Sequence, residues 1–140
     1  MVRQIQKWSI AHLFKEIALE LEPHMVREER VLFPFVKEME NDERSGQSLN
    51  LPTFGTVRNP IRMMEQEHDS AGTIMRRIRE LSNDYTPPEH ACNTYRVAYA
   101  KLKEFEDDLH QHIHLENNIL FPKATELEER LLTEQQVDSL

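Results

Sequence analysis

Apolar residues recur at steps of three and four along three long stretches of this chain, residues 3–42, 59–82 and 89–130. This spacing returns to the same face of an α-helix at every turn, so each stretch predicts one long amphipathic helix. The predicted stripe of the first helix comprises Ile10, Phe14, Ile17, Leu21, His24, Glu28, Val31 and Phe35. The second stripe comprises Ile61, Met64, His68, Ala71, Met75 and Ile78, and the third comprises Tyr95, Ala98, Leu102, Phe105, Leu109, His112, Glu116 and Ile119. Ionisable side chains therefore interrupt all three apolar faces.

Prolines mark points at which the predicted helices change. Pro23 lies inside the first helix, where the loss of a backbone N–H predicts a kink or a restart. Two Leu-Phe-Pro sequences, which end at Pro34 and Pro122, predict a bend or an end in the first and third helices. The Thr-Pro-Pro-Glu sequence at residues 86–89 predicts the start of the third helix, because proline is favoured in a first turn.

The chain contains an internal repeat. Residues 24–40 align with residues 112–128 at an offset of 88, and both copies carry the pattern His-x3-Glu-x3-Leu-Phe-Pro. Residues i and i+4 lie one turn apart on the same helix face, so the imidazole and the carboxylate of each copy can converge on one point. The aligned pairs are His24 with His112, Glu28 with Glu116, Leu32 with Leu120, Phe33 with Phe121, and Pro34 with Pro122.

This arrangement of histidine and glutamate on predicted core faces indicates a metal site. A carboxylate is costly to bury unless a positive charge compensates it, and a cation does so for several ligands at once. Nitrogen and oxygen ligands without thiolate suit iron, manganese or zinc, and two carboxylates that can bridge make a dinuclear site natural. The candidate ligands are His24, Glu28, His68, His112 and Glu116.

Simpler interpretations exist for each part of this pattern. One His-x3-Glu pair is more often an exposed contact worth roughly 0.3 kcal/mol, and His68 alone could be a hydrogen-bonded core histidine. The repetition of the pair on apolar stripes favours the metal site. His110 and His114 flank His112 by two residues, so they are expected on the opposite, solvated side of the helix.

Composition narrows the fold class and the partners. The 140 residues predict a single domain over residues 1–140, and only 3 Gly favour an all-α protein. The 25 acidic residues against 17 basic ones leave a net charge of −8, which disfavours nucleic acid and anionic membranes as partners. No apolar run of 18 residues and no signal-peptide pattern occur, so we expect a soluble, cytoplasmic protein.

Other kinds of chemistry find no support in the sequence. A single cysteine excludes an intramolecular disulfide and a metal site built from cysteine alone. The chain shows no Ser-His-Asp pattern and no phosphate-binding glycine loop, so no catalytic side chain is assigned and any chemistry is expected on the metal.

From about residue 13 to 124, the sequence resembles the hemerythrin-like domain of the di-iron iron–sulfur-cluster-repair family. The blocks that carry the resemblance, in order, are HMVREE with LFP at 24–34, MEQEHDSAG at 64–72, TPPEHAC at 86–92 and DDLHQHIHLENNILFP at 107–122. The resemblance implies an up-down helical bundle with a non-haem di-iron centre, for which manganese or zinc could substitute. It implies bridging carboxylates at Glu28 and Glu116 and terminal ligands at His24, His68 and His112.

Members of that family carry a further N-terminal helix with an additional histidine ligand, and usually a short N-terminal domain with a Cys-Cys motif. This chain has neither, so we expect three long helices of a four-helix bundle, with the first helix missing. Apolar residues such as Trp8, Ile10 and Phe14 would then face water. A homodimer that covers the missing helix is the predicted solution.

The family resemblance implies a response to nitric oxide or oxidative stress. Its members would donate iron to damaged iron–sulfur proteins or react with nitric oxide. A second hypothesis is a non-catalytic module that binds or senses dioxygen or iron. A third is a helical interaction module that no longer binds metal.

Overall fold

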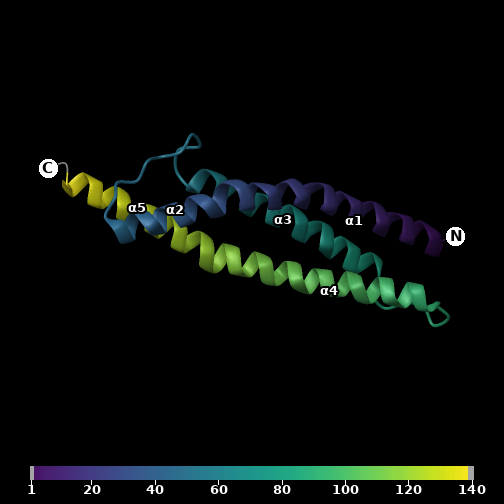
Figure 1. Cartoon of the computed structure of the whole chain (residues 1–140). Helices are drawn as coiled ribbons and strands as arrows, with labels where there is room; N and C mark the ends of the chain where they lie inside the picture. The colour runs from purple at the N-terminus through teal and green to yellow at the C-terminus, as the bar shows by residue number, and fades with distance from the viewer. Residues whose placement is uncertain (1, 139–140) are drawn as a thin grey trace. The chain divides into compact units, whose positions relative to one another are not determined.

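The computed structural model describes residues 2–138 and the side chains of residues 9–135, and every regular element in this part of the chain is helical (Figure 1). Each η element is a single five-residue π-helical turn. The all-α prediction is therefore confirmed. The elements in chain order are α1 (Val2–Arg27), η1 (Glu28–Leu32), α2 (Phe33–Ser45), α3 (Arg58–Leu81), α4 (Asn93–Leu115), η2 (Glu116–Leu120) and α5 (Phe121–Asp138).

The structure tests two of the points predicted from proline. Helix α1 continues through Pro23 to Arg27, so of the two outcomes expected there the helix does not restart. The predicted helix start at residues 86–89 is wrong, because α4 begins at Asn93. The residue before a proline avoids the α conformation, and two consecutive prolines extend this restriction. The segment forms a turn instead, in which the N–H of Ala91 donates to the carbonyl of Pro88 at 3.0 Å.

The chain divides into two compact units, and the first comprises residues 1–22 and 67–113. Its core residues come from α1, α3, α4 and the turn between α3 and α4. They are Ile10, Ile17, Ala71, Ile74, Met75, Ile78, Tyr85, Tyr99 and Leu109.

The turn that joins α3 to α4 is held by a buried carboxylate of the same unit. Asn83, Asp84 and Tyr85 have positive φ angles of 51°, 57° and 58°, which non-glycine residues rarely adopt. The hydroxyl of Tyr85 donates to Oε2 of buried Glu106 at 3.0 Å, and Arg79 pairs with the same carboxylate. These contacts stabilise a turn that the backbone alone disfavours.

The second unit comprises residues 23–66 and 114–140, and α2 and α5 lie side by side in it. Gly46, with φ of 70°, ends α2 in the left-handed conformation that glycine adopts without strain. The core residues of this unit are Leu32, Phe35, Met39, Leu49, Val57, Ile61, Met64, Phe121, Ala124, Leu127 and Leu131.

The start of α3 depends on a buried carboxylate from α5. Glu128 is 3% exposed, and its Oε2 accepts the N–H of Val57 at 2.8 Å, directly before α3 begins. Its other oxygen accepts the hydroxyl of Thr56. Because the N-terminus of a helix carries unsatisfied N–H groups and partial positive charge, Glu128 stabilises this end of α3 in both respects.

The predicted apolar stripes are wrong at one position inside each π-helical turn. Val31 and Ile119 were expected in the core, but their exposed fractions are 43% and 41%. The buried positions are Leu32 and Phe121. A π-helical turn holds about one residue more than an α-helical turn, so the spacing of an ordinary helix misplaces residues inside it.

Of the residues expected to face water, one does and one does not. Phe14 is 37% exposed, as predicted, whereas Ile10 is buried. Ala98, which the third stripe placed in the core, is exposed. The side chain of Trp8 lies outside the described residues.

We predict that Glu128→Ala lowers the free energy of unfolding by about 1–3 kcal/mol, because the buried N–H of Val57 loses its acceptor. Urea unfolding followed by circular dichroism measures the change. The neighbouring Glu129 is exposed and pairs only with exposed Arg58 among the contacts described, so Glu129→Ala is the matched control. Its expected effect is within about 0.5 kcal/mol. Equal losses in both variants would contradict this role of Glu128.

Candidate metal centre

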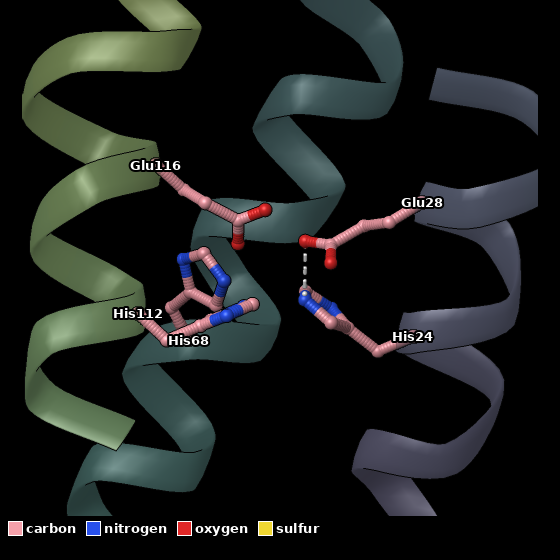
Figure 2. Close-up of side chains that lie close together, drawn as sticks. All are labelled: His24, Glu28, His68, His112 and Glu116. Carbon is pink, nitrogen blue, oxygen red and sulfur yellow. Dashed lines mark ion pairs between the residues drawn. The ribbon is translucent and has the colours of Figure 1, made fainter. Parts of the chain in front are cut away.

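Three of the predicted ligands belong to the second unit. His24 lies in the last turn of α1, Glu28 is the first residue of η1, and Glu116 is the first residue of η2. All three are buried, with exposed fractions of 0%, 2% and 4%. The Nε2 atom of His24 lies 2.9 Å from Oε1 of Glu28, which Figure 2 marks with a dashed line. The i,i+4 spacing therefore brings this imidazole and carboxylate together, as the sequence predicted.

The electrostatics of this group favour a positive charge. Burial raises the pKa of Glu28, the hydrogen bond with His24 opposes that rise, and Glu116 raises the pKa further through a hydrogen bond and charge repulsion. Burial and a like-charged neighbour both disfavour the ionised form of a carboxyl group. A bound cation would reverse this balance, because it stabilises both carboxylates together.

The other two predicted ligands belong to the first unit. His68 lies in the middle of α3 and is 1% exposed, and His112 lies near the end of α4 and is partly buried. Their ring centroids are 5.6 Å apart and the rings are nearly perpendicular, at 85°. The two imidazole rings therefore lie close together in an edge-to-face arrangement.

All five predicted ligands offer one nitrogen or oxygen atom each, and these five atoms lie within 4.8 Å of one another. Figure 2 shows the five side chains pointing toward one another from three helical stretches of the chain. Three imidazole nitrogens and two carboxylate groups form a donor set that suits iron, manganese or zinc. The residues therefore fit a metal ion in their chemistry, their burial and their spacing.

The remaining histidines lie apart from this group. His110 and His114 are exposed, as the helix geometry predicted, and Nδ1 of His114 contacts Nδ2 of Asn118 at 2.9 Å. His12 and His90 are also exposed. Face position on the helix therefore separates the candidate ligands from the other histidines.

The sequence reasoning missed the π-helical turns that begin at the two glutamates. A signal was present, because in both copies of the repeat the proline lies six residues after the glutamate. A proline lacks the N–H that would continue the regular helix, and π-helical turns are one adjustment to it. Periodicity alone contains no information about this adjustment.

Helices that bring histidine and glutamate side chains together, with their ligand atoms within 4.8 Å, are typical of helical metal-binding proteins. Residues 3–124 match the hemerythrin HHE cation binding domain. The chain belongs to this family, and its helices and His/Glu cluster are those of a hemerythrin-like protein.

Similar proteins carry the same region within longer chains. The iron–sulfur cluster repair protein YtfE of Pectobacterium atrosepticum is 44% identical over 115 residues, which are 82% of this chain and 46% of that protein. The corresponding protein of Dickeya chrysanthemi is 45% identical over 75% of this chain and 42% of its own. A probable iron–sulfur cluster repair protein of Haemophilus influenzae is 41% identical over 79% of this chain and 44% of its own. The chain thus spans somewhat less than half the length of these relatives.

Within residues 2–138, no helix has both the length and the apolar character needed to cross a bilayer.

Proposed function

We propose that this chain holds a non-haem di-iron centre, with Glu28 and Glu116 as bridging carboxylates and His24, His68 and His112 as terminal ligands. The convergence of the five ligand atoms within 4.8 Å is the observation that supports this assignment most directly. Helical bundles commonly build such centres from side chains of facing helices. Manganese or zinc would suit the same donors and could replace iron.

Each residue type has a distinct task in this proposal. The imidazoles of His24, His68 and His112 would hold the metal ions as nitrogen ligands from separate helical stretches. The two carboxylates would balance the cationic charge. Burial excludes water from most of this ligand set, which strengthens the electrostatic attraction. Bound iron would supply redox chemistry and a site for small ligands such as nitric oxide or dioxygen.

We further propose that the protein acts in the repair of iron–sulfur proteins during nitric oxide or oxidative stress, in the cytoplasm. The support is the family membership and the names of the three relatives, which are iron–sulfur cluster repair proteins. Two routes fit a buried di-iron centre: donation of iron to damaged clusters, and reaction with nitric oxide. Because the chain spans less than half of those relatives, both routes are proposals for this region.

Iron content is the first test. We predict about two iron ions per chain, the number that a dinuclear carboxylate centre requires. His112→Ala should abolish tight iron binding, because it removes one donor of the cluster. His114→Ala changes an exposed histidine two residues away and is the matched control. Elemental analysis of protein loaded with ferrous iron without oxygen and then desalted measures the ratio. Equal losses in both variants would contradict the assignment of faces.

A second measurement distinguishes a repair function from the binding of dioxygen or iron without catalysis. The iron-loaded chain should restore the activity of a peroxide-damaged iron–sulfur enzyme or consume nitric oxide, and His112→Ala should do neither. Enzyme recovery and a nitric oxide electrode measure these effects. The alternative function, a non-catalytic module that binds or senses dioxygen or iron, predicts a reversible spectral change with dioxygen and neither activity.

A homodimer remains our prediction for the partner of the first unit. Its α1 and α4 border an apolar groove of about 620 Å³, and exposed Phe14 lies in its lining. Apolar surfaces of this kind mark protein contacts, and a second copy would offer the same surface in return. The groove lining includes Ile10, Phe14, Tyr95, Ala98, Leu102 and Phe105.

We therefore expect light scattering to give twice the chain mass of 16.6 kDa. Phe14→Asp should yield the monomer, because a charge would enter the apolar contact. Leu19 is 65% exposed on the same helix and does not line the groove, so Leu19→Asp should leave the dimer intact. A monomeric parent chain would contradict the prediction.

A further inference from the structure

The two copies of the repeat share an unusual backbone feature at the same place. Each contains one π-helical turn, Glu28–Leu32 and Glu116–Leu120, and each turn begins at the buried glutamate. The N–H of Phe33 donates to the carbonyl of Glu28, and the N–H of Phe121 donates to the carbonyl of Glu116. These hydrogen bonds span five residues instead of four. Because single π-helical turns are rare and concentrate at functional sites, their coincidence with both glutamates requires a reason.

Burial on either side of each turn shows which residues enter the core. Upstream of the first turn, His24 and Glu28 follow the ordinary i,i+4 spacing and are buried together. Downstream, Leu32 and Phe35 are buried while Val31 is exposed. In the second copy the next buried residue after Glu116 is Phe121, five positions on, while Ile119 is exposed. The two copies therefore share the π-helical turn but differ in which residue first enters the core of the second unit.

The prolines account for the location of the turns. Pro34 and Pro122 each follow the phenylalanine whose N–H closes the π-type hydrogen bond. In a regular α-helix their rings would collide with the carbonyl four residues earlier, and no N–H would bond to it. Those carbonyls belong to Arg30 and Asn118, inside the π-helical turns. Widening the helix there removes both conflicts.

We propose that the two Leu-Phe-Pro sequences are positioning elements: they impose π-helical turns that aim Glu28 and Glu116 while α2 and α5 keep their apolar faces in the core of the second unit. The closeness of the two carboxyl groups supports this role, since a carboxylate oxygen of Glu28 and one of Glu116 lie within 4.8 Å of each other. The inference rests on the proposed metal centre. It assigns no ligand beyond the five and instead explains what orients two of them.

Removal of one residue from a turn tests the proposal. Arg30 and Asn118 are exposed, and deletion of either removes the extra residue while the flanking helices keep their register. Each deletion variant should stay folded, and its iron-free form should melt at or above the temperature of the parent. Its iron affinity should fall at least tenfold, the scale on which ligand-orienting groups act. Arg30→Ala and Asn118→Ala keep the chain length and are the matched controls, with unchanged affinity.

Two measurements on every variant make the outcomes distinct: thermal melting of the iron-free chain and iron affinity by competition with a chelator. A deletion variant that stays folded and binds iron like the parent would overturn the proposal. So would a folded deletion variant that melts well below the parent, because that result assigns the turns a purely structural role. Loss of iron with an unchanged or raised melting temperature supports it.

A second pair of variants covers the case in which the deletions prevent folding. Pro34→Ala and Pro122→Ala keep the chain length and restore the missing N–H, so the turn can relax toward the α-helix and iron affinity should fall. Pro88→Ala, in the turn that joins α3 to α4, is the control, because Pro88 belongs to the first unit and both π-helical turns belong to the second. Unchanged affinity in the two proline variants would then overturn the proposal. If the parent itself binds no iron, the proposed function fails. The melting temperatures of the iron-free variants then still show whether the turns stabilise the fold.

Discussion

The burial of two carboxylates beside each other is the constraint on which the rest of this structure depends. Glu28 and Glu116 are almost fully buried, and each raises the cost of ionising the other. Such a pair is stable only where positive charge and hydrogen-bond donors are at hand. The imidazole of His24 lies close enough to Glu28 to donate a hydrogen bond to it, and a metal ion would supply the positive charge.

Two other buried glutamates, which lie outside the group of candidate ligands, have different partners. Glu106 binds Tyr85 and Arg79 and holds a strained turn, and Glu128 accepts the N–H of Val57 at the start of a helix. Their partners belong to the fold itself, so burial alone does not distinguish a metal ligand from a structural acid. The neighbouring histidines make that distinction, and they were visible in the sequence as the His-x3-Glu repeat.

The repeat also explains why backbone irregularity and the candidate ligands coincide. A π-helical turn has weaker hydrogen-bond geometry than an α-helical turn, so a protein keeps one only where it confers a benefit or where neighbours enforce it. Here proline enforces it from one side and the packed residues Leu32 and Phe121 from the other. The same tripeptide therefore serves the backbone, the core and the orientation of the glutamates.

The sequence by itself determined the all-α fold, the three long helical stretches and the five candidate ligands on their apolar faces, because helical periodicity and i,i+4 spacing are local properties of the chain. It misplaced Val31 and Ile119, and it began the last long helix four residues early. Only the tertiary structure decided those points. Which side of a helix is buried at a wide turn depends on the packing of residues distant in sequence.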